Sequence, residues 1–217
     1  GSGSGIILSE NGYILTSYHV IENANNITVS LRSGHAFPAE VIGSDTTSDV
    51  AILKIDPQFS GGEDTGGQNA DLTPAVFGDS DQLEVGSPVV AIGNPLGQLG
   101  GTVTAGYISA LDRNLQVGNN TYTLLQTDAA INGGNSGGGL FNAQGELVGL
   151  VMAKTSGISA SGTLVEGLGF AIPINEIKGV IDDLLNYGQV NRVALGISML
   201  DILDDRTAAS YYVDQPG

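Results

Sequence analysis

Residues 131–141 (INGGNSGGGLF) set one serine, Ser136, among five glycines that fall within seven positions. Glycine loses more conformational freedom on folding than any other residue, so such a cluster is costly unless the backbone needs it. A serine hydroxyl is a poor nucleophile, and it attacks a carbonyl only when a neighbouring base takes its proton. Ser136 is therefore a candidate nucleophile if the chain also supplies a histidine base and an aspartate that orients it.

The order of histidine, aspartate and serine along the chain separates the possible arrangements. Ser136 fits the G-x-S-x-G motif of the α/β hydrolases, but these enzymes place the histidine after the serine. Both His19 and His35 precede Ser136. A subtilisin-like arrangement needs an aspartate before the histidine, and the first aspartate here is Asp45. The remaining order, histidine then aspartate then serine, is that of chymotrypsin.

Two histidines compete for the role of the base. His19 lies in 13–22 (YILTSYHVIE), where an apolar strand gives way to a more polar segment, and such a strand end can aim an imidazole into a cleft. His35 lies in 32–37 (RSGHAF), a hairpin turn in which we expect it to be solvated. A lone histidine is usually structural, but its setting and the chain order favour His19 as the base.

For the aspartate, Asp49 directly precedes the apolar strand expected at 50–55. There a carboxylate can be buried against an imidazole while the following strand fixes it. Asp45 and Asp56 bracket that strand and look like turn residues. Asp128 is close to the serine but would break the order, so we interpret it as a structural hydrogen-bonding group. We predict that Asp49 orients His19.

The glycines around Ser136 are explained by the oxyanion that forms when a serine attacks a carbonyl. Backbone N–H groups must already point at that oxygen. Gly134 and Ser136 would supply them, with Asn135 at their border, while Gly137 and Gly138 would let the next strand pass under the cleft. The alternative, a glycine-rich loop with an idle serine, does not account for the matching histidine and aspartate upstream.

The composition limits the classes of function that the chain can have. The chain has 217 residues, of which 41% are apolar and 14% are charged, with a formal net charge of −16. Such a charge argues against nucleic-acid partners. The absence of cysteine excludes disulfides and thiolate chemistry, and two histidines without an HExxH motif make a metal site unexpected. No run of 18 apolar residues exists, and the start lacks the layout of a secretory signal, so we expect no membrane contact from this chain.

Short apolar or alternating runs between Gly, Asn and Asp predict an all-β fold. Two groups of such runs flank a polar loop at 56–74, and we interpret each group as roughly six strands, which predicts two packed antiparallel six-stranded β-barrels. We place the first barrel, with the histidine and aspartate, at 1–80 and the second, with the serine and a helix, at 81–188. The runs are 5–8, 13–16, 26–31, 39–43, 50–55, 87–93, 102–111, 122–127, 146–154 and 167–173.

The stretch 173–188 predicts one C-terminal helix. We expect Asn175 to cap its start, Gly188 to end it, and its apolar stripe to pack on the second barrel. Gly179 weakens it slightly. The stripe consists of Ile174, Ile177, Ile181, Leu184 and Leu185.

The sequence strongly resembles the HtrA (DegP-like) serine proteases, trypsin-fold enzymes of protein quality control. The resemblance covers nearly the whole chain from residue 3 to about residue 175 and assigns His19, Asp49 and Ser136 to the catalytic triad. It also implies an oxyanion hole made by the amides of Gly134, Asn135 and Ser136, and no metal or cofactor. The stretches that carry it are 3–21, 48–56, 77–97, 104–111, 126–142 and 167–173.

The same resemblance implies a specificity pocket, an assembly and a location. Residues 164–169 would lie near the substrate strand, the full-length protein would be a homotrimer, and its location would be extracytoplasmic, either periplasm or cell surface, with a possible N-terminal anchor. Residues 112–122 are either the family's regulatory loop or an ordinary hairpin turn. Residues 189–217 would be a linker and the incomplete start of a PDZ domain. The implied substrate-binding residues are Ile131, Leu164, Val165 and Gly167.

Three residues depart from the family pattern. Gly133 and Gly139 stand where the family usually has proline, and Tyr18 stands beside the base in place of an asparagine. Glycine leaves a loop less restricted than proline does. We therefore expect an oxyanion hole that is less well organised before substrate arrives.

Together these observations predict an ATP-independent serine endopeptidase that degrades unfolded or misfolded proteins. An edge strand near the cleft would pair with an extended substrate backbone irrespective of its sequence. Ala129, Ala130 and Ile131 offer no acidic partner, so we expect small or medium aliphatic side chains at the cleavage site. The alternative is a catalytically silent protease-like domain that binds unfolded clients.

Overall fold

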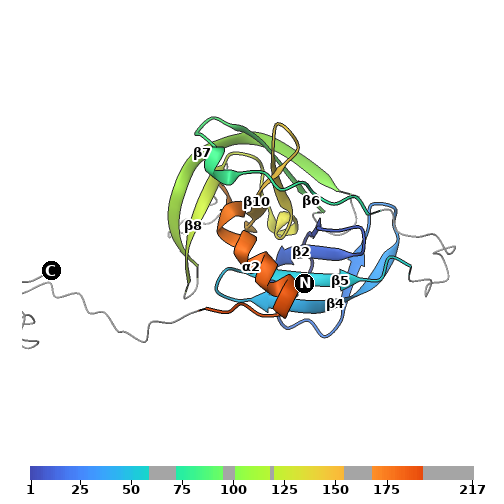
Figure 1. Ribbon diagram of the computed structural model, residues 1–217. Helices are drawn as coiled ribbons and strands as arrows, with labels where there is room; N and C mark the ends of the chain where they lie inside the picture. The colour runs from blue at the N-terminus through green and yellow to red at the C-terminus, as the bar shows by residue number, and fades with distance from the viewer. Residues whose placement is uncertain (59–71, 95–100, 118–119, 154–167, 193–217) are drawn as a thin grey trace, which may run out of the picture.

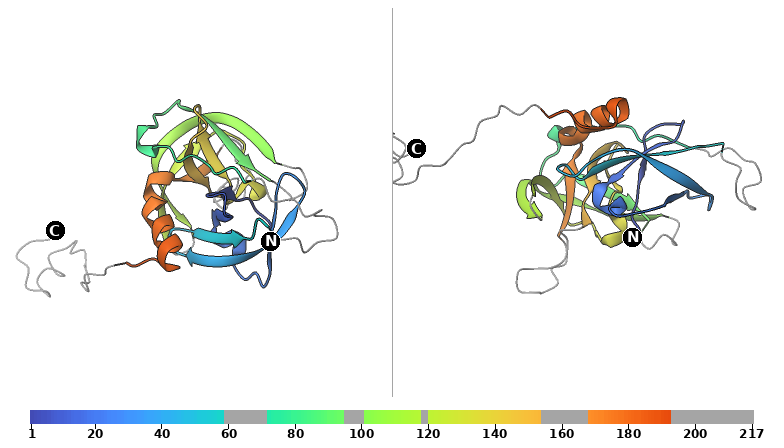
Figure 2. Two further views of the ribbon diagram at one scale, coloured as in Figure 1. Left: turned by 45° about the vertical axis from the view of Figure 1, so that its right-hand side comes forward. Right: turned by 90° about the horizontal axis from the view of Figure 1, so that it is seen from below.

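The computed structural model describes residues 1–58, 72–94, 101–117, 120–153 and 168–192 (Figure 1). Its described elements are mostly β-strands, which form two sheets, and one long helix lies across both. Figure 2 shows the same arrangement from two further sides. The predicted all-β fold with a C-terminal helix is confirmed.

The N-terminal half is a five-stranded antiparallel sheet in the order β1-β2-β5-β4-β3. Six strands were predicted for a closed barrel, and the described residues differ from this. Residues 72–87 hold an isolated bridge at Phe77 and a short 3₁₀ helix, Ser80–Gln82, so the described part contains no sixth strand to close the sheet. The strands are β1 (Ile6–Ile7), β2 (Tyr13–Ser17), β3 (Ile27–Ser30), β4 (Ala36–Asp45) and β5 (Val50–Ile55).

The C-terminal half is a closed six-stranded barrel in the order β10-β11-β8-β7-β6-β9, as predicted. β7 is long and bulged where it pairs with β8, which lets the strand curve around the barrel. The strands are β6 (Pro88–Gly93), β7 (Thr102–Val117), β8 (Asn120–Thr127), β9 (Gly139–Asn142), β10 (Leu147–Val151) and β11 (Gly169–Pro173).

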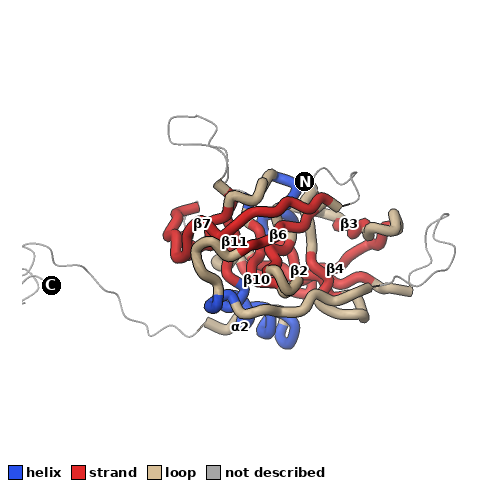
Figure 3. The backbone as a smooth tube through the Cα atoms, turned by 90° about the horizontal axis from the view of Figure 1, so that it is seen from above, coloured by secondary structure: helices blue, strands red, loops and turns tan. Residues whose placement is uncertain are grey.

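The predicted helix is α2 (Ile174–Tyr187), and Gly188 ends it in a left-handed conformation with φ +72°. The predicted cap at Asn175 is wrong. Pro173 occupies the cap position, and the Asn175 side chain instead donates to Asp79 at 2.6 Å. The apolar stripe contacts β10 and β11 of the barrel and also β4 and β5 of the sheet, so α2 lies on both halves (Figure 3).

The largest apolar cluster joins the two halves. Leu15 and Ile52 of the sheet pack in it with Leu124 and Leu150 of the barrel and with the buried face of α2. Each such side chain contributes about 1.5–3 kcal/mol through burial. The junction between the halves is therefore held firmly. Neither helix in the described ranges is long and apolar enough to cross a membrane.

Candidate active site

The structure brings His19, Asp49 and Ser136 into one hydrogen-bonded row at the junction of the two halves. His19 Nδ1 lies 2.6 Å from Asp49 Oδ2, and His19 Nε2 lies 2.6 Å from Ser136 Oγ. These residues are 30 and 117 positions apart in the chain. His19 belongs to the one-turn helix α1 (Tyr18–Ile21) directly after β2, Asp49 ends the β4–β5 turn, and Ser136 follows the short 3₁₀ turn Gly133–Asn135.

The backbone around Asp49 fixes the pair with the histidine. The amide of Tyr18 donates to the carbonyl of Asp49 at 3.0 Å, and the amide of His19 donates to Asp49 Oδ1 at 2.9 Å. Asp49 has φ +57°, which is uncommon for a residue with a side chain. Such a conformation persists where the surroundings over-determine it. Here two main-chain bonds and the imidazole do so.

Burial sets the roles that these atoms can take. The side chain of Asp49 is 8% exposed and that of His19 is 17% exposed. A carboxylate at Nδ1 favours the tautomer with its proton on Nδ1, which leaves Nε2 free to accept the serine proton. The row is therefore arranged for activation of the Ser136 hydroxyl.

Of the other candidates, His35 and Asp128 lie where the sequence predicts, whereas Asp45, expected as a turn residue, is buried at the end of β4. His35 is half-exposed and lies in the turn before β4. Asp128 accepts the amide of Tyr107 at 2.6 Å, which is a structural bond. Asp45 ends β4 and holds the turn that leads to Asp49.

Two amides of the loop before Ser136 donate hydrogen bonds within the loop itself. The amide of Gly134 donates to Asn132 Oδ1 at 3.3 Å, and the amide of Asn135 donates to the Asn132 carbonyl at 2.9 Å. These are two of the three amides predicted to form the oxyanion hole. In this conformation they bind Asn132 within the turn.

Ser4 is a buried residue of the site that the sequence did not single out. Its hydroxyl donates to the carbonyl of Gly134 at 2.6 Å and accepts the amide of Asn94 at 2.7 Å. Its own amide donates to the carbonyl of Ser136 at 2.8 Å. Ser4 therefore ties the first strand segment to both sides of the Ser136 turn. Residues 1–5 are rich in glycine and look like a flexible chain end, so nothing in the sequence pointed to a role for Ser4.

Residues 3–150 match the family described as trypsin-like peptidase domain. The chain belongs to that family.

The trypsin-like peptidase domain has close relatives among the HtrA and DegP serine proteases. It is 47% identical over 207 residues to "Serine protease Do-like HtrB" of Bacillus subtilis (strain 168), covering 92% of this chain and 42% of the relative. It is 42% identical over 205 residues to "Probable periplasmic serine endoprotease DegP-like" of Rickettsia conorii, covering 94% of this chain and 37% of that protein. The chain thus spans about two fifths of these relatives.

A solved structure agrees with the sequence comparison. "HtrA-type protease AlgW with decapeptide" superposes with a TM-score of 0.79 at 41% identity, covering 99% of this chain and 61% of that chain.

The packing of the peptidase domain explains why glycines surround Ser136. Gly137 has φ +80°, and a Cβ there would lie 2.4 Å from Thr16 Oγ1 and 2.5 Å from the Ser4 carbonyl. A Cβ on Gly138 would lie 2.3 Å from the carbonyl of Ile92. The turn therefore passes so close to β2 and β6 that side chains do not fit.

Gly139, where the resemblance would place proline, faces an aromatic ring. A Cβ at Gly139 would lie 2.4 Å from the Phe141 ring and 3.0 Å from Leu147. The Phe141 ring therefore fills the space that a side chain at position 139 would need. This gives a packing reason for the departure from the family pattern.

The predicted specificity residues lie partly outside the described ranges. Ile131 packs against the barrel core, and a Cβ on Gly169 would lie 2.5 Å from its Cγ1. Leu164, Val165 and Gly167 fall in 154–167, outside the described residues. The expected PDZ start at 193–217 does so as well. Across the described ranges, no group of three or more His, Cys, Asp or Glu residues could hold a metal ion.

Proposed function

We propose that this peptidase domain is an ATP-independent serine endopeptidase in which His19, Asp49 and Ser136 form the catalytic triad. The observation that carries the proposal is the unbroken row of two 2.6 Å contacts, from Asp49 to His19 and from His19 to Ser136. Its relatives are named serine proteases, which supports the same activity.

The reaction follows from this geometry. His19 Nε2 takes the proton of the Ser136 hydroxyl as the oxygen attacks a peptide carbonyl, and Asp49 stabilises the imidazolium that forms. His19 then gives the proton to the leaving amine, which leaves an acyl group on Ser136. Water, activated by His19, hydrolyses that ester and restores the serine. No metal or cofactor takes part.

The oxyanion would be bound by the amides of Gly134, Asn135 and Ser136. Because the first two bind Asn132 in the described conformation, substrate binding has to turn the Gly133–Asn135 segment before the tetrahedral intermediate is stabilised. Glycine at 133 lowers the steric resistance to such a rotation.

The substrates we propose are extended segments of unfolded proteins with a small or medium aliphatic side chain before the cleaved bond. Ile131 would line the pocket for that side chain, with Leu164, Val165 and Gly167 along the substrate strand. A peptide library tests this, and preferred cleavage after Lys or Arg would refute it.

Location and assembly are proposed on the same basis. Relatives from Haemophilus influenzae and Rickettsia conorii are named periplasmic, which supports an extracytoplasmic location for this chain too. We also propose a homotrimer for the full-length protein, and a division into 1–80, 81–188 and a linker with the start of a PDZ domain at 189–217. Sedimentation of the full-length protein would test the trimer.

Labelling of Ser136 by a fluorophosphonate tests the activity directly. The probe reacts with an activated serine, so we expect labelling of the wild-type chain and none of Ser136→Ala. Absence of labelling in both would favour the silent binding domain. The row is complete, so no described contact supports that alternative.

A further inference from the structure

Outside the triad, Arg192 and Asp45 form a two-pronged ion pair. Arg192 Nη1 lies 2.6 Å from Asp45 Oδ1, and Nη2 lies 2.6 Å from Oδ2. Asp45 is 7% exposed, whereas the arginine side chain is 48% exposed. A guanidinium that binds both oxygens of a carboxylate fixes its orientation as well as its charge. The pair therefore holds a buried aspartate from the surface side.

Asp45 lies directly before the turn that carries the triad aspartate. It ends β4 and pairs with Val50, the first residue of β5, so residues 46–49 form the loop between them. Asp45 Oδ2 also accepts the amide of Ser48 at 2.8 Å and the Ser48 hydroxyl. The next residue is Asp49 with φ +57°. The orientation of the Asp45 carboxylate thus sets the backbone directly before Asp49.

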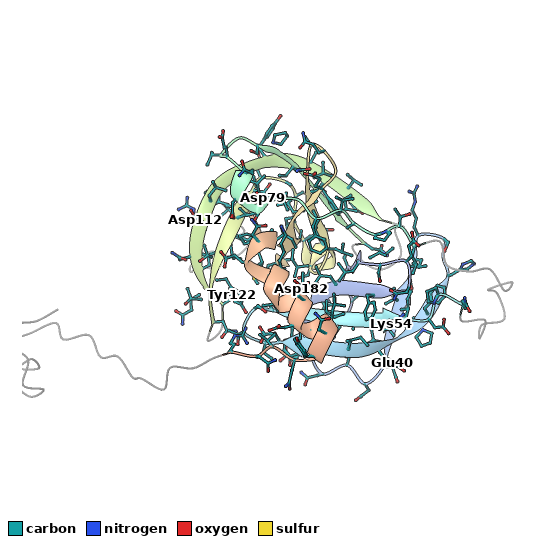
Figure 4. The ribbon with its side chains drawn as sticks, viewed as in Figure 1. Glu40, Lys54, Asp79, Asp112, Tyr122 and Asp182 are labelled. Carbon is teal, nitrogen blue, oxygen red and sulfur yellow. The ribbon has the colours of Figure 1, made fainter. Side chains whose placement is uncertain are left out.

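The barrel also contacts the same turn. Asn120 Nδ2 donates to the carbonyl of Thr46 at 2.9 Å. Burial raises the pKa of Tyr122, and the negative charges of Asp49 and Asp45 raise it further, since this ring lies near both aspartates. Figure 4 shows Tyr122 on β8, at the edge of the barrel. The turn is therefore bound both by the barrel, through Asn120, and by Arg192, through Asp45.

The end of α2 places Arg192 beside Asp45. A Cβ on Gly43 would lie 2.4 Å from the carbonyl of Gly188, so the end of the helix touches β4 two residues before Asp45. The amide of Asn191 donates to Asp183 of α2 at 3.3 Å, which directs the following residue. Figure 1 shows the segment leaving α2 beside β4. Arg192 thus reaches the turn through close backbone packing.

We propose that Arg192 is a positioning residue for the triad aspartate: by binding Asp45 it fixes the turn that presents Asp49 to His19. The inference rests on the proposed function. Without Arg192 the buried charge of Asp45 loses its main partner, which is costly in a protein interior. The turn then relaxes toward solvent, and Asp49 leaves its strained conformation and its contact with the imidazole.

The test uses the full 217-residue chain with Arg192→Met, Arg192→Lys, Asp45→Asn and the double variant Asp45→Asn/Arg192→Met. Arg32→Met is the matched control, since Arg32 is an exposed arginine in the turn before β4. For each variant, kcat and KM are measured on a fluorogenic peptide with valine before the cleaved bond. The far-downfield proton resonance of the His19–Asp49 hydrogen bond is recorded by NMR, and urea unfolding gives the folded fraction.

We expect Arg192→Met to lower kcat about tenfold with KM within about twofold, and to weaken the proton resonance. Arg192→Lys should recover part of kcat because it keeps the charge but loses the fork. The double variant should be no slower than the slower single one, because both act through one contact. Arg32→Met should match the wild type in kcat, KM and resonance.

An unchanged kcat and resonance in Arg192→Met would overturn the inference. So would additive losses in the double variant, or a loss of kcat that follows the folded fraction while the resonance stays intact. If the wild-type chain cleaves no peptide and Ser136 is not labelled, the proposed function fails instead. The resonance needs no turnover, so it still decides whether Arg192 positions Asp49.

Discussion

The amide of Gly134, two residues before the proposed nucleophile Ser136, donates to Asn132 Oδ1 at 3.3 Å. This contact caps the 3₁₀ turn Gly133–Asn135 and binds a proposed oxyanion donor within the turn. A side-chain cap of this kind contributes about 1 kcal/mol to a helical turn. The Asn132 cap thus slightly stabilises a loop conformation in which the proposed oxyanion hole lacks the Gly134 amide.

Removal of that cap should speed the reaction of Ser136. In Asn132→Ala the amide of Gly134 is free to face the cleft, so we expect fluorophosphonate labelling about five times faster than in the wild type. Asn142→Ala is the matched control, because Asn142 caps the turn between β9 and β10 by accepting the amide of Gln144 at 3.0 Å. Labelling of Asn132→Ala at the wild-type rate, or slower, would contradict the proposed role of the cap.

Ser4→Ala should weaken both the fold and the site. The substitution leaves the half-buried carbonyl of Gly134 and the amide of Asn94 without their shared partner. Each unsatisfied group of this kind costs about 1–3 kcal/mol. We expect a lower urea midpoint and labelling of Ser136 slowed on the order of tenfold. Ser2→Ala, an exposed serine in the same segment, should behave as wild type. Equal behaviour of the two variants would show that Ser4 does not support the turn.

Two glycines with the same backbone angle separate conformational strain from steric contact. Gly137 has φ +80° and Gly145 has φ +78°, but a Cβ at Gly145 would meet nothing within 4 Å. We expect Gly145→Ala to cost about 1 kcal/mol from backbone strain alone. Gly137→Ala should cost several kcal/mol more, because its methyl group would overlap Thr16 and Ser4. Urea unfolding measures both, and similar values would argue against close packing around the Ser136 turn.

The Asp45–Arg192 pair should make stability depend on acid pH. Burial alone would raise the pKa of Asp45, but hydrogen bonds from Arg192 and Ser48 outweigh it and lower the pKa from 3.8 to about 2. A carboxyl with a lower pKa in the folded state adds stability above its unfolded pKa and loses it as pH falls. The loss should therefore occur between about pH 4 and pH 2.

With allowance for the solvent around the half-exposed arginine, we expect this contribution to be on the order of 1–2 kcal/mol. Urea unfolding at pH 6 and pH 2.5 measures it. Asp45→Asn should lose less stability between these pH values than the wild type. Asp182→Asn, on the exposed face of α2 (Figure 4), should keep the wild-type pH dependence. A pH dependence in Asp45→Asn that equals the wild type would contradict the assignment.

The catalytic candidates and most of the fold could be predicted from the sequence, because both predictions depend on residue types and their order along the chain. Only one order of histidine, aspartate and serine was possible, and strand patterns on both sides of 56–74 predicted two β halves. The apolar stripe of α2 was predicted from its 3.6-residue period. The end of α2 at Gly188 was predicted because a helix commonly ends at a residue with positive φ, which glycine adopts readily.

What the sequence did not reveal depends on contacts between distant segments. Ser4 lies in a glycine-rich start, and its bonds to Gly134 and Asn94 form only after the halves meet. Arg192 lay in a predicted linker, and its partner Asp45 is 147 residues away. Asn175 looked like a cap, but its side-chain oxygen accepts Lys178 Nζ at 2.7 Å and its amide donates to Asp79. The sequence did not predict that the N-terminal sheet has five strands and stays open, because periodicity does not show which strands pair with one another.

The rate at which a fluorophosphonate labels Ser136 in Asp49→Asn, compared with the wild type and with Asp182→Asn, tests the triad most directly. An asparagine keeps the shape but favours the wrong tautomer of His19, so labelling should slow by about 10⁴-fold, while Asp182→Asn should be unaffected. Labelling of Asp49→Asn within a few-fold of the wild-type rate would contradict the proposed triad.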